Sequence, residues 1–166
     1  MRSWVKRKRN NQGFTLIELT IVIAILAILV GILAPQYIKY VEKSRKSTDI
    51  SNLEQLVKAV QVSNVDTDYY INAGRYFIMM KTDSTIIFTD DSNINDNDLN
   101  TQKLVNAVEE YTGYKFEKNG FSYQCNSLKL KSNRWENQYI YAMIYLSEES
   151  NIVVEYVPSN IKDLTK

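Results

Sequence analysis

The sequence contains no histidine at all, and this absence removes several common kinds of active site. Neither a Ser-His-Asp or Cys-His catalytic arrangement nor a His-ligated zinc or iron site can be built without that residue. Among the common enzyme chemistries, only those based on carboxylates, lysine or tyrosine remain open. No cofactor or metal is expected from this composition.

The chain also has only one cysteine, Cys125, so no disulfide can form within it. Small exported domains often depend on disulfides, whereas any folded domain here must depend on its hydrophobic core. We therefore expect the folded part, from about Thr48 to the C-terminus, to be insensitive to reducing agents. Nowhere does the sequence show a glycine-rich phosphate loop, a paired-cysteine motif or an internal repeat.

Negative charge is missing from the first 13 residues, which hold five basic ones: Arg2, Lys6, Arg7, Lys8 and Arg9. The whole chain has a formal net charge of +1, with 20 basic and 19 acidic residues. Without the first 13 residues, 15 basic side chains face 19 acidic ones, a net charge of −4. Such a chain has no global attraction for nucleic acid, and no specific nucleic-acid partner is expected.

An apolar run follows this basic segment, reading FTLIELTIVIAILAILVGILA over residues 14–34, with Glu18 as its one formal charge. About 20 apolar residues in a helix span the hydrocarbon core of a bilayer. The basic residues ahead of the run hold that end in the cytoplasm and place the rest outside. An ordinary signal peptide or signal anchor is the alternative, but the run is too long for a cleaved signal and no small-x-small site follows it.

Glu18 is the most unusual residue of the apolar run. A carboxylate at the centre of a membrane helix costs about 2.5–3.5 kcal/mol on insertion scales, and such a residue is a functional candidate by default. The run itself offers no obvious partner for it. Cleavage after Gly13 would create one, the new α-amino group of Phe14.

The sequence G-F-T-L-I-E-L at 13–19, behind a short basic leader and ahead of an apolar helix, is similar to the class III signal of type IV pilins and type II secretion pseudopilins. This resemblance covers residues 6–60 or so. It implies that a prepilin peptidase cuts after Gly13 and methylates the amino group of Phe14. It also implies that Glu18 forms an assembly salt bridge with the amino terminus of a neighbouring subunit.

Apolar contact alone does not fix the axial register of neighbouring helices. A buried charge pair does, because a slipped neighbour leaves both charges unpaired at low dielectric. We therefore interpret Glu18 as a register device. Gly31 and Pro35 weaken one turn of the same helix, since Pro35 has no N–H for the carbonyl of Gly31. The turn predicts a mild kink, and by the resemblance it extends when subunits pack.

Beyond the proline, apolar residues recur at helical spacing to Val60, with charged residues between them. We expect Ile50 to Val60 to pack on a sheet, and the polar residues 36–49 to join membrane and head. The predicted fold is α+β, a long N-terminal helix packed on an antiparallel sheet head. Its predicted parts are a basic leader (1–13), a transmembrane and filament-core helix (14–35), an amphipathic continuation (36–62) and a globular head (63–166).

Within the head, alternating or apolar runs bounded by polar turns predict strands. These runs are 76–80 and 85–89, which read as a hairpin, then 121–125, 128–131, 138–146 and 151–157. In the longest run, one face is aliphatic and belongs against the helix. The other face is rich in tyrosine, and is either half-covered core or an adhesive patch.

An Asp/Asn segment at 90–98 separates the hairpin from a predicted helix, which carries Leu104, Val105, Val108 and Tyr111 on one face and stops at Gly113. Its oxygens could ligate calcium. However, it lacks the glycine and the bidentate glutamate of an EF-hand loop, so a solvated loop is the simpler interpretation.

The leading interpretation is a type IV pilus subunit used in adhesion or motility, and the alternative is a secretion or competence pseudopilin. A membrane-anchored surface enzyme is a remote third, resting only on carboxylates such as Glu109 and Glu110. The resemblance implies a homopolymer as the final state. It implies a prepilin peptidase and an inner-membrane platform with an assembly ATPase as partners. The expected location is the cell membrane, then an extracellular filament.

Overall fold

The computed structural model describes residues 13–65, 71–90, 94–149, 151–161 and 163, and of residues 94–98 it describes only the backbone. The basic leader up to residue 12 therefore lies outside the described residues, as do the side chains of 91–98 that were considered for calcium. The chain divides into two compact units, Met1–Tyr40 and Val41–Lys166.

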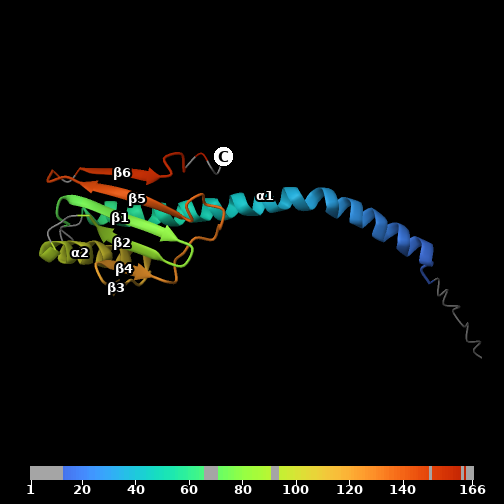
Figure 1. The fold of residues 1–166 in the computed structure, drawn as a ribbon, viewed down its shortest axis with the longest axis horizontal. Coiled ribbons are helices and arrows are strands. Elements are labelled where there is room, and N and C mark those ends of the chain that lie inside the picture. Colours follow the sequence, from blue (N-terminus) through green and yellow to red (C-terminus); the bar gives the residue numbers. More distant parts are fainter. Residues whose placement is uncertain (1–12, 66–70, 91–93, 150, 162, 164–166) are drawn as a thin grey trace, which may run out of the picture. The chain divides into compact units, whose positions relative to one another are not determined.

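The expected long helix is present as α1, Leu16–Ser63, whose 48 residues belong to both units (Figure 1). Its first half is built largely of leucine, isoleucine, valine and alanine, and continues through Pro35. The helix ends at Ser63, whose hydroxyl donates to the carbonyl of Val60 at 2.9 Å, and the N–H of Asn64 donates to the same carbonyl at 3.1 Å. Residues 64 and 65 form a turn.

In the second unit, six strands form one antiparallel sheet in the order β3-β4-β2-β1-β5-β6. The strands are β1 Gly74–Lys81, β2 Thr85–Thr89, β3 Glu117–Asn119, β4 Ser122–Cys125, β5 Tyr139–Leu146 and β6 Ile152–Val157. The hairpin of β1 and β2 pairs Phe77 with Phe88, and β1 lies between β2 and β5 in the middle of the sheet. The predicted α+β class is confirmed.

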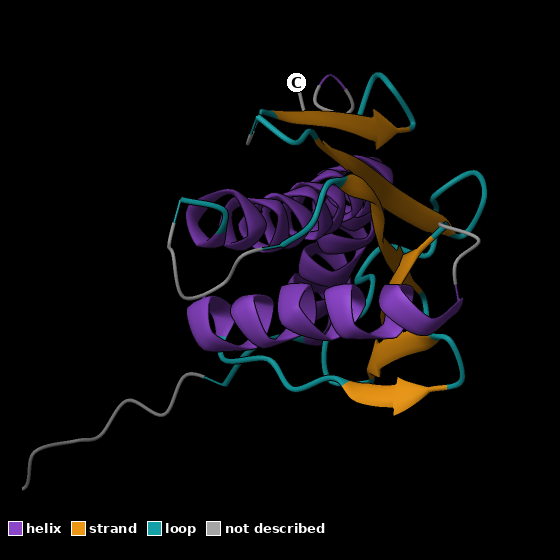
Figure 2. Ribbon diagram, turned by 90° about the vertical axis from the view of Figure 1, so that its left-hand side faces the viewer, coloured by secondary structure: helices purple, strands orange, loops and turns teal. Residues whose placement is uncertain are grey.

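Two helical segments cover the same face of this sheet, the second half of α1 and helix α2, Ile94–Thr112 (Figure 2). Alternation in β5 sets its orientation, because every second side chain of a strand points to the same face. Its aliphatic residues are buried in the core and its tyrosines are half-buried, as predicted. The core joins three groups of buried side chains: Leu53, Leu56, Val57 and Val60 of α1; Leu104, Val105 and Val108 of α2; and Ile78, Ile140, Ala142 and Ile144 of the sheet.

Neither of the two helices covers the opposite face of the sheet. The rings of Phe77 and Phe88 stack there, with their centroids 4.9 Å apart and their planes 7° from parallel. The ring centroid of Tyr141 lies 6.3 Å from that of Phe77 and 6.1 Å from that of Tyr139. The tyrosine face is therefore a half-exposed aromatic surface and not a second core.

Helix α2 ends just before Gly113, the residue at which the sequence predicted that it would stop. Gly113 has φ +76°, which L side chains rarely adopt, and its N–H donates to the carbonyl of Glu109 at 2.8 Å. The buried face of α2 is shorter than expected: Leu104 and Val108 are buried, but Tyr111 is exposed. Tyr111 lies in the last turn of α2.

The segment 128–131 is not a strand, although its side chains alternate between buried and exposed. Its backbone makes single, scattered hydrogen bonds and not a ladder. The N–H of Leu130 donates to the carbonyl of Lys81 at 2.9 Å, and the carbonyl of Leu128 accepts from the Thr85 hydroxyl at 2.8 Å. The strand prediction was wrong because alternating buried and exposed side chains show only that one side of a segment is buried. They do not show that its backbone pairs with a neighbouring strand.

Candidate functional site

The Gly13–Phe14 bond lies just before the first turn of α1, in backbone that is neither helix nor strand. Both residues are exposed. An added Cβ at Gly13 would meet nothing within 4 Å, so no contact in the described chain requires glycine there. The bond predicted as the cleavage site is therefore accessible, and any need for glycine must come from a binding partner.

Glu18 has a partner within its own chain, contrary to the expectation from the sequence. Its carboxylate Oε2 accepts a hydrogen bond from the Thr15 N–H and another from the Thr15 hydroxyl, both at 2.8 Å. The N–H of Glu18 donates to the Thr15 hydroxyl oxygen at 3.3 Å. Thr15 and Glu18 thus form a capping box, which satisfies N–H groups that the first helical turn leaves unpaired. The signal was present in the sequence as the spacing T-x-x-E.

This capping box directs the Glu18 carboxylate toward the N-terminal end of its helix, the end that carries Phe14. A carboxylate in the first turn also interacts favourably with the helix dipole. Glu18 is therefore held close to where a new amino terminus would form if the chain were cut before Phe14.

The side chains that follow Glu18 are exposed over the whole apolar segment. The exposed large apolar residues of the first unit include Leu19, Ile21, Val22, Ile23, Ile25, Leu26, Ile28, Leu29, Val30, Ile32 and Leu33. A water-exposed helix of this kind would be unstable by the loss of about 1.5–3 kcal/mol for each large side chain left unburied. By length and composition, the segment is apolar enough to cross a membrane.

Gly31 and Pro35 both lie within α1. A Cβ added at Gly31 would meet no atom within 4 Å apart from the helix's own backbone. The described contacts of the first unit therefore give no packing reason for this glycine. Close approach of another helix, or local weakening of the turn, are the remaining physical reasons for it.

A second cluster of polar residues ties α1 to the long connection between β4 and β5. Asp49 is fully buried, although the sequence placed it among solvated residues of the stalk. Its Oδ1 accepts from the N–H of Lys131 at 2.7 Å, and its Oδ2 from the N–H of Ser132 at 3.0 Å and the indole N–H of Trp135 at 2.9 Å. We call Asp49 and these three donors the Asp49 clasp.

Neighbouring residues of α1 strengthen the same contact. The carboxylate of Glu42 accepts a hydrogen bond from the Ser132 hydroxyl. The ammonium of Lys46 lies 4.8 Å from the centroid of the Trp135 ring, a cation–π contact. In a protein without disulfides, this cluster fixes the connection at the end of the head where α1 enters it.

The carboxylates considered for an enzyme do not form a catalytic pair. Glu109 accepts from the N–H of Phe116 at 2.6 Å and from the ammonium of Lys115 at 2.9 Å, which ties the end of α2 to the chain leading into β3. Partial burial opposes ionisation, but these two donors outweigh it and lower the pKa of Glu109. Glu109 is thus a structural carboxylate and not simply part of a solvated face.

Other reactive groups in the described part of the chain are equally committed to structure. Cys125 is buried, with its sulfur 3.1 Å from the Ser127 hydroxyl oxygen. Burial raises the pKa of Tyr156, and the nearby carboxylate of Glu54 raises it further. Among the described residues, no group of three or more Cys, Asp or Glu side chains could hold a metal ion.

Comparisons with known proteins find matches to part of the chain. Residues 8–34 match the family model described as the prokaryotic N-terminal methylation motif. The chain is 43% identical over 61 residues to the type IV major pilin protein PilA of Myxococcus xanthus, and 41% identical over 71 residues to the type IV major fimbrial protein FimA of Dichelobacter nodosus. It is 35% identical over 77 residues to the type IV wide pilus major component PilA4 of Thermus thermophilus.

These matches cover 37%, 43% and 46% of this chain, and 28%, 44% and 59% of the respective relatives. The chain thus matches less than two thirds of the length of each relative. No solved structure matches the fold. Residues 8–34 thus carry the N-terminal methylation motif, and part of the chain is similar to type IV major pilins and fimbrial proteins.

Proposed function

We propose that this protein is the structural subunit of a type IV pilus, made as a precursor and polymerised into a surface filament. The observation that carries the proposal is a carboxylate, Glu18, held in the first turn of an otherwise apolar and exposed helix, next to the Gly13–Phe14 bond. The methylation motif of residues 8–34 and the names of the relatives, all major pilins or fimbrial proteins, support the same reading.

In this proposal a prepilin peptidase cuts between Gly13 and Phe14 and methylates the new amino group. The helix then remains in the membrane until an inner-membrane platform and its ATPase extract it. Growth of the filament replaces lipid around the apolar residues with the helices of other subunits. The amino terminus of one subunit pairs with Glu18 of its neighbour, which fixes the register of the two helices.

Thr15 belongs to this mechanism through its hydrogen bonds to Glu18. While the subunit is in the membrane, these bonds satisfy part of the carboxylate and reduce its desolvation cost. In the filament, an incoming amino group supplies the opposite charge that Thr15 lacks. The turn at Gly31 and Pro35 is proposed to extend as neighbouring helices pack, since one of its carbonyls has no N–H partner.

The names of the relatives favour a pilus over the shorter pseudopilus of a secretion system, because they are pilus and fimbrial components. An adhesive or motile filament, outside the cell after assembly and in the membrane before it, follows from that choice. The half-exposed aromatic face of the sheet is a candidate for adhesive contact.

The test is to shear filaments from cells and analyse their subunits by intact mass and N-terminal sequencing. We expect a chain that begins at Phe14 and carries one additional methyl group. A matched variant, Gly13→Val, should fold normally, because nothing lies within 4 Å of that position, yet accumulate uncut in the membrane. A mature chain that begins elsewhere, near residue 35 for instance, would refute the proposal.

A further inference from the structure

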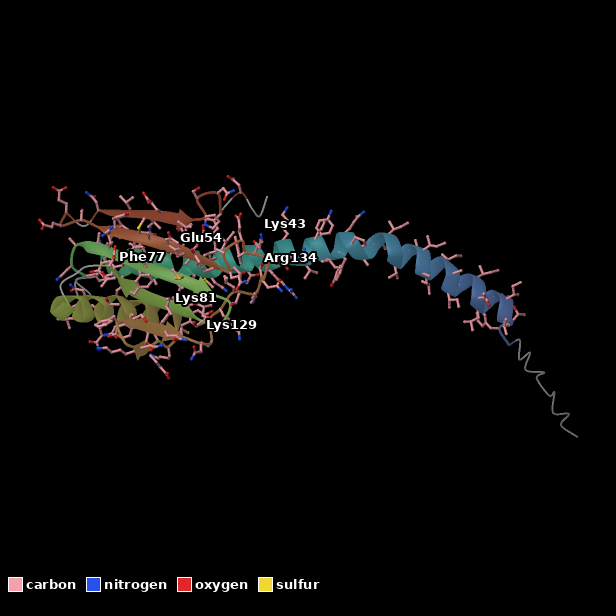
Figure 3. The ribbon with its side chains drawn as sticks, viewed as in Figure 1. Lys43, Glu54, Phe77, Lys81, Lys129 and Arg134 are labelled. Atoms are coloured by element: carbon pink, nitrogen blue, oxygen red, sulfur yellow. The ribbon has the colours of Figure 1, made fainter. Side chains whose placement is uncertain are left out.

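Basic side chains gather at the end of the second unit where α1 enters it. They come from three separate segments, α1, the end of β1 and the β4–β5 connection, and we call them the basic rim: Lys43, Arg45, Lys46, Lys81, Lys129, Lys131 and Arg134. Figure 3 shows Lys43 and Arg134 near the entering helix and Lys81 and Lys129 at the same end of the sheet. Glu54 and Phe77 lie further along the head.

The carboxylates of these segments are too few, and too occupied, to neutralise the rim. Asp49 is buried and accepts three hydrogen bonds from main-chain and indole donors. Glu42 is largely covered, bonded to a serine hydroxyl and 3.7 Å from Arg45. Near the rim, Asp83 and Glu136 present exposed carboxylates, two against the seven basic side chains.

The described charged residues at the opposite end of the head include both signs. Arg75 pairs with Asp90 at 2.9 Å, and Glu148 and Glu149 are exposed.

A shallow cavity of about 150 Å³ opens within the rim. Lys46 and Arg134 contribute cationic groups to its wall, and Asn137 and Asn160 contribute amides. One carboxylate, Glu136, also lines it. Two cations with amide donors form a surface that suits a phosphate group, since both kinds of side chain donate hydrogen bonds to its oxygens.

The position of the rim along the chain brings it close to a membrane. Ile38 is the last exposed large aliphatic residue of the first unit, and exposed tyrosines flank it at 37 and 40. Tyrosine is enriched where a membrane helix meets the headgroups. Lys43 follows Ile38 by five residues, about 7.5 Å along a helix, which is within the Debye length of about 8 Å at physiological salt.

We propose that the basic rim binds the headgroups of anionic phospholipids while the subunit is held in the membrane. This inference rests on the membrane-held stage of the proposed function. An anionic membrane surface attracts lysine and arginine side chains that lie near it. Incorporation into a filament then requires release of the rim from lipid.

Nucleic acid would also be attracted to a basic patch. The lipid is favoured because the chain itself tethers the rim to the bilayer, which gives headgroups a high effective concentration there. A nucleic acid must instead be recruited from solution by a chain whose net charge after residue 13 is −4.

The experiment reconstitutes the full chain in vesicles of phosphatidylcholine, with or without roughly one third of phosphatidylglycerol as the anionic lipid. Vesicles are floated to isolate the inserted protein. Trace acetylation with mass spectrometry then measures the reaction rate of each lysine. Lys43, Lys81, Lys129 and Lys131 report on the rim. Lys58 is an internal control, exposed on the same helix and about 22 Å beyond Lys43 by helical rise.

We expect acetylation of the rim lysines to slow about fivefold or more in the anionic vesicles, since each basic side chain near such a surface contributes about a factor of five to its binding. High salt should abolish the slowing, and Lys58 should react equally in both vesicles. In the paired variant Lys129→Gln/Lys131→Gln, the acetylation rate of Lys81 can still be measured. Most of its slowing in anionic vesicles should be lost. Both changes keep the main-chain N–H groups that hold the connection. The variant Lys58→Gln/Lys103→Gln removes the same charge elsewhere and should keep the protection.

Equal rates in the two kinds of vesicle, or equal slowing at Lys58, would overturn the proposal. Protection by duplex DNA in neutral vesicles, without protection by phosphatidylglycerol, would assign the rim to nucleic acid and overturn it as well. A chain that fails to float with vesicles refutes the membrane-held stage itself. A chain that floats without lipid-dependent protection refutes the rim alone.

Discussion

Replacing Asp49 removes the acceptor on which the β4–β5 connection depends. In Asp49→Ala the N–H groups of Lys131 and Ser132 and the indole of Trp135 all lose their partner. In Asp49→Asn the side chain keeps its shape but has only one acceptor oxygen. Its amide N–H₂ then faces at least one of these donors, whichever way the group is turned.

The cost follows from the burial of the site and the number of donors. A hydrogen bond to a charged group contributes about 1.5–3 kcal/mol, and a buried donor left unsatisfied costs about 1–3 kcal/mol. Loss of one such bond gives a cost of about 1.5–3 kcal/mol for Asp49→Asn, which keeps one acceptor oxygen. Asp49→Ala should cost about 3–5 kcal/mol, less than three full bonds because water can enter the space left behind. A domain of this size has a stability of about 5–15 kcal/mol, so the alanine variant should be close to unfolding.

The assay is denaturant unfolding of a fragment of residues 41–166, in which Trp135 is the only tryptophan, because the other is Trp4. Its fluorescence reports on the clasp itself, since the indole N–H is one of the three donors. Circular dichroism of the same samples reports on the whole domain. The midpoints should fall in the order wild type, Asp49→Asn, Asp49→Ala, with an unchanged dependence of the unfolding free energy on denaturant.

A matched control is Asp90→Asn, which breaks the exposed ion pair with Arg75, 2.9 Å long, and should cost less than about 1 kcal/mol. The reasoning is refuted if Asp49→Ala costs no more than this control. It is also refuted if Trp135 fluorescence changes while the unfolding free energy does not, because the clasp would then be local and carry no stability.

Three further predictions concern other residues. Glu18→Gln should insert and be cut normally but assemble few filaments, because each buried amino group would lack its charge partner at a cost of about 3–5 kcal/mol; normal filament numbers by electron microscopy would contradict the register role. Glu109→Gln should destabilise the head at neutral pH and do so less as the pH falls. Because the pKa of Glu109 is lowered in the folded state, its carboxylate stabilises the fold above the unfolded-state pKa of 4.5. That stabilisation is lost as the pH falls through the folded-state pKa, so parallel curves of unfolding free energy against pH for the two proteins would contradict the prediction. Gly113→Ala should cost about 1 kcal/mol through backbone strain alone, since no atom lies within 4 Å of the added Cβ, and Gly113→Asn should cost less; an unchanged melting temperature for the alanine variant would contradict the strain.

The sequence by itself determined what depends on composition and on short-range spacing. An apolar run of bilayer length with one carboxylate near Gly13–Phe14 was enough to indicate the resemblance to type IV pilins, because all parts of this signal lie within one short stretch of sequence. Strict alternation in β5 and the hairpin of β1 and β2 were also readable, since a two-residue period and a polar turn are local signals. The capping box of Thr15 and Glu18 was equally local, and a four-residue spacing rule would have found it.

Only the tertiary structure decided which polar residues are buried and which backbones pair. Asp49 looks like any stalk residue until segments 82 to 86 residues away bring three donors to it. The same contact takes the N–H of Lys131, one of the backbone groups that 128–131 would need for a ladder. Strand β3 has three exposed polar residues, and it exists because β4 offers it an open edge. A buried charge or an edge strand is set by its partners, and these are distant in sequence and close only once the chain has folded.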